Sequence, residues 1–237
     1  MSHPHDRNGA RVGGARLRTL TAAGAAAGAL GLMSVLSSCN IVAPVAMIIE
    51  GPPSVDPQFK LDKDRPTLIL VDDTLNILPR RRLRNEMSKK AQDMLLAKGT
   101  LKKVIDAEAA YAVVAGDREG KATSLIEIAR AVGAEVIVSV TVDSFGVTSP
   151  DNEMVYECGF RVRVLDVGRA PQPRVWPPAE IAEGAACTAR LRLPAGRKID
   201  TNAEWSAAQN SLAEQTGKAI AQVFQKHERS QSAAAGK

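Results

Sequence analysis

Three aspartates are the residues whose types and spacing come nearest to catalytic chemistry. Asp72 and Asp73 directly follow an apolar run at residues 67–71, and Asp143 follows a second apolar run at 136–142. Short apolar runs rich in β-branched residues are typical of buried strands. If both strands lay in one sheet, the three carboxylates could meet at its edge and hold Mg²⁺, as a metal-assisted enzyme would require. The interpretation we favour is that Asp72 and Asp73 serve the loop and the start of the next helix, a common role for such carboxylates.

Other catalytic side chains are scarce. Two of the three histidines, His3 and His5, stand at the start of the chain, which leaves His227 for the rest. A serine or cysteine nucleophile needs a base within reach, and a structural zinc ion needs four ligands. The sequence also contains no Gly-x-Ser-x-Gly and no glycine-rich phosphate loop. We therefore predict a protein without catalysis and without a cofactor.

Cys39 carries a different kind of chemistry. An amino-terminal stretch with four arginines precedes residues 19–36, which are uncharged and rich in Ala, Gly and Leu. This is the layout of a secretory signal. The segment ends in Leu36-Ser37-Ser38-Cys39, which resembles the lipobox of bacterial lipoproteins. The resemblance implies cleavage between Ser38 and Cys39 and lipid on Cys39; the alternative is that 19–36 remains as a short membrane helix.

Both alternatives place the rest of the chain outside the inner membrane. Asn40, and not an aspartate, follows Cys39. By the same resemblance, a host with two membranes would sort such a lipoprotein to the outer membrane, facing the periplasm. The membrane itself is then the first expected partner, through the lipid on Cys39.

The charge balance argues against nucleic acid. The chain has 31 basic and 26 acidic residues, but residues 1–38 hold four of the basic and one of the acidic ones, which leaves 27 against 25. A mature chain so near neutrality lacks the basic footprint of a nucleic-acid-binding domain. Aromatic residues make up 3% of the chain, too few for a platform on which bases could stack.

Hydrophobic periodicity predicts one α/β domain with a mixed (α+β) sheet. The expected order is β-α-β-α-α-β, followed by antiparallel strands and a carboxy-terminal helix packed on the sheet. Capping boxes at Ser124–Glu127 and Thr201–Glu204 mark two helix starts. We expect helices at 79–98, 107–114, 125–132 and 202–224, and strands at 67–71, 101–105, 136–142, 156–165, 174–176 and 187–193. The predicted divisions are a signal at 1–38, a lipidated start and tether at 39–65, the domain at 66–227 and a disordered tail at 228–237.

Two sets of arginines and one pair of cysteines are candidate functional residues. The first set lies at a predicted helix start and comprises Arg80, Arg81, Arg82 and Arg84. The second set lies on the polar side of predicted strands and comprises Arg161, Arg163, Arg190 and Arg192. Either set could be a solvated face or a contact with an acidic partner, and the first could also contact anionic lipid. Cys158 and Cys187 lie on the apolar sides of predicted strands, where a disulfide and two buried thiols are both possible.

Three motifs resemble one group of periplasmic domains. They are Gly133-Ala134-Glu135-Val136-Ile137-Val138-Ser139-Val140, Arg161-Val162-Arg163-Val164-Leu165-Asp166-Val167 and Val175-Trp176. The group comprises the curli-secretion lipoproteins, the lipoproteins that activate penicillin-binding proteins, and the amino-terminal domain of TolB. The resemblance implies a scaffold that binds envelope proteins and has no catalytic residues. A homo-oligomer, or a subunit of an envelope secretion complex, is the further possibility, although no segment alternates over the length that a membrane hairpin needs.

Overall fold

The computed structural model describes residues 54–115, 123–148, 155–169, 171–193 and 199–228. The predicted signal, the cleavage point between Ser38 and Cys39, and the tail from 229 onward lie outside the described residues. No helix within the described ranges is both long enough and apolar enough to cross a membrane.

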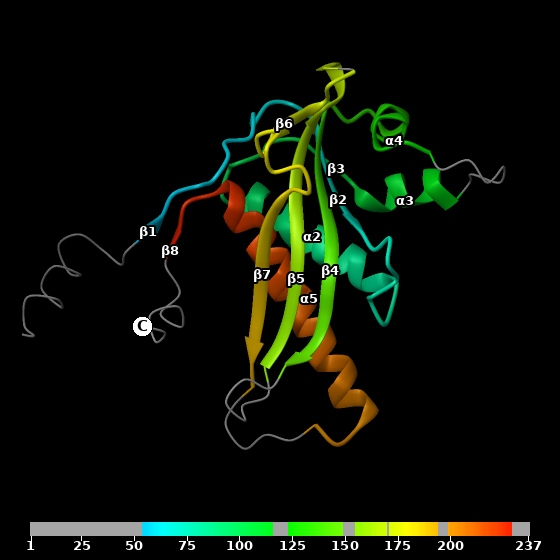
Figure 1. Cartoon of the computed structure of the whole chain (residues 1–237), viewed down its shortest axis with the longest axis vertical. Coiled ribbons are helices and arrows are strands. Elements are labelled where there is room, and N and C mark those ends of the chain that lie inside the picture. Colours follow the sequence, from blue (N-terminus) through cyan, green and yellow to red (C-terminus); the bar gives the residue numbers. More distant parts are fainter. Residues whose placement is uncertain (1–53, 116–122, 149–154, 170, 194–198, 229–237) are drawn as a thin grey trace, which may run out of the picture. The chain divides into compact units, whose positions relative to one another are not determined.

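A six-stranded mixed sheet forms the centre of the domain (Figure 1). Its central path runs in the order β3-β2-β4-β5-β6, and β7 pairs with β5 beside β6. The pairs β2–β3 and β2–β4 are parallel, whereas β5 is antiparallel to β4, β6 and β7. The mixed α/β prediction is therefore confirmed. The strands are β2 (Thr67–Asp72), β3 (Val104–Ile105), β4 (Val136–Thr148), β5 (Val155–Asp166), β6 (Arg174–Trp176) and β7 (Ala185–Arg192).

Four α-helices connect or close this sheet: α2 (Arg82–Ala97), α3 (Ala107–Ala115), α4 (Leu125–Val132) and α5 (Asn202–Phe224). Both predicted capping boxes are present. In each, the hydroxyl accepts from the glutamate N–H and the glutamate side chain accepts from the N-cap N–H. Helix α2 begins at Arg82, and not at Pro79. The Asp73 carboxylate accepts from the backbone N–H groups of Ile77 and Leu78, at 2.7 and 3.0 Å, and so holds the preceding loop out of the helix.

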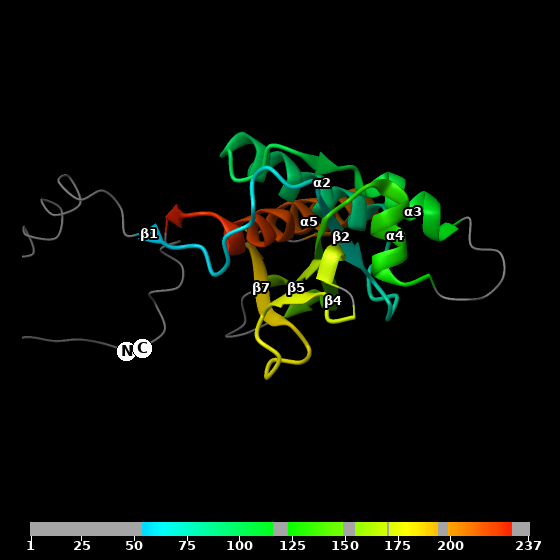
Figure 2. The same cartoon turned by 90° about the horizontal axis from the view of Figure 1, so that it is seen from above.

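The helices cover the two faces of the sheet unequally (Figure 2). Helices α2 and α5 lie on one face, where they bury alternate residues of β4 and β5, such as Val140 and Val162. Helices α3 and α4 lie on the other face, over Leu68 and Leu70 of β2 and Ile137 of β4. Over β5 and β7 this second face has no described helix on it.

The folded unit begins earlier than the predicted boundary at residue 66. Strand β1 (Ser54–Val55) pairs with β8 (His227–Glu228) in antiparallel fashion, and the N–H of Gln58 donates to the carbonyl of Val223 at 2.8 Å. Phe59 lies 6.0 Å from Trp176 between ring centroids and packs on the core. The Pro, Asp and Lys residues around Phe59 are typical of a flexible linker, which is why the sequence predicts a tether here. The partly buried side chains of Phe59 and Leu61 instead pack on the core and hold residues 54–65 against the domain as a strap.

Candidate interaction surface on the open face of the sheet

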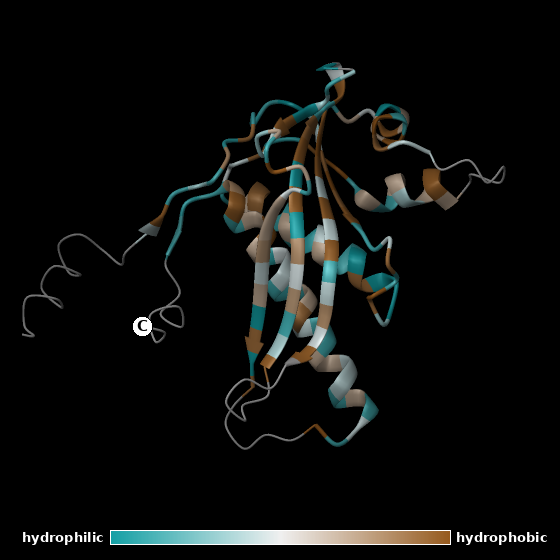
Figure 3. Ribbon diagram, viewed as in Figure 1, coloured by the Kyte–Doolittle hydropathy of each residue, from teal (hydrophilic) through white to brown (hydrophobic). Residues whose placement is uncertain are grey.

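Hydrophilic and hydrophobic residues alternate along β4 and β5 (Figure 3), and the hydrophilic set lies on the side of β4, β5 and β7 that faces away from α2 and α5 (Figure 1). Strand geometry explains it, because alternate residues point to opposite faces and the apolar set is buried under the two helices. We call this side the open face. Its charged and hydroxyl residues are Thr141, Asp143, Glu157, Arg161, Arg163, Thr188, Arg190 and Arg192.

Arg161 stands at the centre of the open face and is held on two sides. Its Nε lies 2.9 Å from both carboxylate oxygens of Asp143, and its Nη1 lies 2.7 Å from Oε2 of Glu183. The hydrogen bonds that Arg161 donates to Asp143, with the charges of both acids, raise the pKa of Arg161. The guanidinium is therefore neutralised locally and fixed in orientation.

The other arginines of the open face fall into two kinds. Arg190 donates to Oε2 of Glu157 across the β5–β7 pair at 2.7 Å. Arg163 and Arg192 form no ion pair within the described part of the chain. Gly184, at φ 110°, lets the loop before β7 pass beside Arg163, since a Cβ there would meet Arg163 Cγ at 3.0 Å. The open face thus has a neutralised centre and two guanidinium groups that form no ion pair with any residue that the structure describes.

The basic run before α2 is divided by the fold. Nη2 of Arg80 donates to the carbonyl of Ser206 at 3.1 Å and to Oδ1 of Asn210 at 2.8 Å, both on α5. The guanidinium carbon of Arg84 lies 4.8 Å from the centre of the Tyr111 ring. Only Arg81 and Arg82 are exposed, so the expectation of one solvated basic face is wrong for Arg80 and Arg84. Their long stems and charges serve helix packing, which local sequence does not reveal.

The three aspartates do not form a metal site. Asp72 accepts from the Thr74 hydroxyl at 2.9 Å, Asp73 holds the loop that precedes α2, and Asp143 is bound to Arg161. Among the residues that the structure describes, no three His, Cys, Asp or Glu side chains could hold a metal ion. The loop-stabilising interpretation of Asp72 and Asp73 is supported. The expected meeting of the three carboxylates is wrong, because the Asp143 carboxylate is bound by Arg161 instead.

The two described cysteines are free thiols. Cys158 pairs with Ala189 and Cys187 with Phe160, so the two cysteines are offset by two residues on neighbouring strands. A diagonal pair of this kind is about 7–8 Å apart, too far for a disulfide without movement of the backbone. Burial raises the pKa of Cys158 to about 12 and also raises the pKa of Cys187. Both thiols are protonated near neutral pH and are poor nucleophiles.

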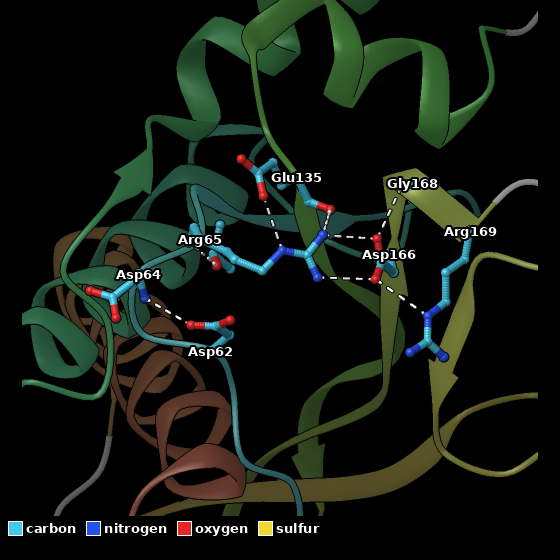
Figure 4. Close-up of polar contacts among 8 residues, drawn as sticks. Asp62, Asp64, Arg65, Glu135, Asp166, Gly168 and Arg169 are labelled. Atoms are coloured by element: carbon cyan, nitrogen blue, oxygen red, sulfur yellow. Dashed lines mark hydrogen bonds and ion pairs between the residues drawn. The ribbon is translucent and has the colours of Figure 1, made fainter.

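A second polar cluster, centred on Arg65, was not predicted (Figure 4). Its Nη1 and Nη2 donate to the two Asp166 oxygens at 3.0 and 2.9 Å, and its Nε donates to Oε2 of Glu135 at 3.0 Å. These bonds, followed by one from the Gly168 N–H, lower the pKa of Asp166. The cluster joins the strap to the ends of β4 and β5. Arg65 and Asp166 are 101 positions apart, and no local pattern links them.

Comparisons with known proteins find distant structural similarity only. No family model and no curated protein matches the chain. Solved structures that resemble it include the hypothetical protein CT253 from Chlamydia trachomatis, with 15% identity and a TM-score of 0.41 over 67% of this chain and 93% of that one. Lipoprotein GNA1162 from Neisseria meningitidis has 13% identity and a TM-score of 0.35 over 63% and 95%. The LpoB C-terminal domain from Salmonella enterica has 14% identity and a TM-score of 0.30 over 63% and 94%. Similarity this distant assigns no function, which has to be inferred from the residues of this chain.

Proposed function

We propose that this protein is a lipid-anchored lipoprotein of the cell envelope that binds another envelope protein without catalysing a reaction. The proposal rests on the arrangement of charges on the open face. An antiparallel sheet can face water on one side, so an uncovered face alone would say little. Here the face combines a guanidinium fixed by two acids with Arg163 and Arg192, which have no described acidic partner. A rigid surface with unmatched charge is suited to bind a partner that supplies the missing acids.

Small residues make close approach to this surface possible. Ala186 and Thr188 lie between the charged positions of β7, in register with Arg161 and Gly159, and the Ser144 hydroxyl accepts from the Gly159 N–H at 3.0 Å. Ala186 and Thr188 leave the β7 side of the face low, whereas Arg161 stands at its centre and Arg163 and Arg192 stand near its two ends. A partner strand or loop could therefore lie across the face and place acidic side chains against both guanidinium groups.

The absence of catalysis is inferred from the side chains available. Within the described ranges the thiols are protonated, His227 is the one histidine, and it contacts the carbonyl of Gln225 at 3.1 Å. A nucleophile and a base within reach of each other are the minimum for covalent catalysis. Binding is then the role that the described side chains support best.

The anchor supplies the other half of the function. Lipid on Cys39 would hold the domain at a membrane and raise its local concentration for a partner in the same compartment. In a host with two membranes we propose the outer membrane, with the domain facing the periplasm. Replacing Cys39 with alanine should abolish fatty-acid labelling and move the protein to the soluble fraction. Cys187→Ala, which changes an unlinked thiol, should keep the label; a labelled Cys39→Ala protein would refute the anchor.

Site-specific photo-crosslinking in cells tests the open face. A benzophenone amino acid at Thr188, on the open face, should give one discrete adduct of higher mass. The same probe at Lys89, exposed on α2, is the matched control and should give none. Mass spectrometry of the adduct identifies the partner. Adducts of equal yield at both positions, or none at Thr188, would contradict binding through the open face.

A further inference from the structure

Exposed lysines gather at the end of the domain where the anchor segment enters. We call this the anchor-proximal end; it comprises the strap 54–65, the carboxy-terminal ends of α2 and α5, and the start of β3. Its exposed lysines are Lys60, Lys63, Lys98, Lys102, Lys103 and Lys226.

Two contacts bring lysines from different segments together at this end. The N–H of Lys102 donates to the carbonyl of Lys63 at 2.9 Å. Lys98 and Lys226 line the same shallow depression of about 420 Å³ as Ser54. The chain therefore folds so that separate basic stretches meet beside the strand that leads to the anchor.

The acids at this end do not cancel the lysines. The exposed acids here are Asp56, Asp62, Asp64 and Glu228. Nζ of Lys102 donates to Oδ1 of Asp64 at 2.8 Å. This hydrogen bond, with the charges of Lys63 and Lys103, lowers the pKa of Asp64.

The helix ends explain only part of the cluster. Lys98 and Lys226 follow the carboxy-terminal ends of α2 and α5, where a positive charge interacts favourably with the negative end of the helix dipole. The other four lysines lie on the strap and at the start of β3, where no helix ends. They call for a different explanation.

The covalent path to the anchor also favours this end. The β1–β8 pair fixes Ser54 here, and Ser54 lies 15 positions after Cys39, a reach of at most about 50 Å. Helix α5 spans 23 residues, or about 35 Å, and it separates this end from the Arg80 end. The anchor-proximal end is therefore the described part of the domain that lies nearest to Cys39 along the chain.

We propose that the anchor-proximal end docks on the anionic headgroups of the bilayer in which Cys39 is anchored. The proposal rests on the lipid anchor proposed above. Docking would orient the domain as well as tether it. Lysine is suited to this contact because its ammonium group interacts with anionic headgroups as a point charge, without a fixed geometry.

Lysine footprinting on vesicles tests the docking. The acylated mature protein is reconstituted in vesicles of phosphatidylcholine alone or of phosphatidylcholine with phosphatidylglycerol, and treated with a water-soluble acetylating reagent. Mass spectrometry should show that Lys60, Lys98 and Lys103 react severalfold more slowly on the anionic vesicles, and that high salt restores their reactivity. Lys89 on α2 should react equally on both. Unchanged rates at the three lysines, or an equal fall at Lys89, would overturn the proposal.

A second comparison separates failure of the docking from failure of the anchor. The intact mass of the purified protein reports acylation directly. Should acyl chains be lacking, the anchor is refuted, and docking is then judged by flotation of the same protein with anionic vesicles at low salt. The double variant Lys98→Glu with Lys103→Glu should lose that flotation, whereas Lys89→Glu should keep it. Equal flotation of both variants would refute docking, whatever the state of Cys39.

Discussion

Strand β5 presents its alternate residues to two different environments. Phe160, Val162 and Val164 are buried under α2 and α5, whereas Arg161 and Arg163, between them, point to the open face. The buried set gains stability from apolar area removed from water. The exposed set lies in a high dielectric, where ion pairs add little to stability. The covered side of β5 therefore stabilises the fold. The open side contributes little to stability, so it can carry the charges that the proposed binding requires.

The largest effect is expected on the covered side. Leu83 of α2 is fully buried in the core, whereas Leu96 of the same helix is 43% exposed. Leu83→Ala should lower the free energy of unfolding by about 2–5 kcal/mol, because it removes buried methyl groups and leaves a cavity. Leu96→Ala should lower it by less than about 0.5 kcal/mol. Urea unfolding measures both, and equal losses would contradict the packing of α2 described here.

The Arg65 cluster should give an intermediate effect that depends on pH. Asp166→Asn removes a charge-assisted pair that is partly exposed, so a loss of about 1 kcal/mol is expected at neutral pH. The folded pKa of Asp166 is below its ordinary value of 3.8. Its contribution is therefore fully present above pH 3.8 and is lost as the pH falls through the lower folded value. Urea unfolding as a function of pH should show the wild type and the variant converging in acid; a constant difference would contradict the assignment.

The ion pair between Arg190 and Glu157 should contribute least to stability. Arg190 is largely exposed, so the pair is expected to contribute between about 0 and 1 kcal/mol. A double-mutant cycle with Arg190→Ala and Glu157→Ala isolates this coupling. A coupling well above 1 kcal/mol would mean that the open face is less solvated than its exposure indicates.

The contrast between local and long-range contacts explains what the sequence could predict. The capping boxes at Ser124 and Thr201 were predictable because both partners lie within four residues. The alternation along β5 was predictable because it depends on one strand alone. The strap, the Arg65 cluster and the burial of Arg80 were not, since each depends on a partner distant along the chain: Arg80 reaches Asn210, 130 positions away.

In the candidate site, too, local features could be predicted from the sequence and long-range contacts could not. Arg161 and Arg163 could be placed on a polar face from their spacing, but their different pairing could not. Asp143 looked like a metal ligand because the sequence does not show that Arg161 lies beside it. Cys158 and Cys187 could not be resolved from spacing, because the register of β5 against β7 decides whether they meet.

The most direct test of the account combines binding and stability in one variant. Arg163→Glu with Arg192→Glu reverses the two charges of the open face that have no described acidic partner. Arg192 is exposed and Arg163 is half-buried, so we predict that the free energy of unfolding changes by about 1 kcal/mol or less while the cross-link from Thr188 disappears. An adduct that persists at full yield in this folded variant would contradict the claim that the open face binds the partner.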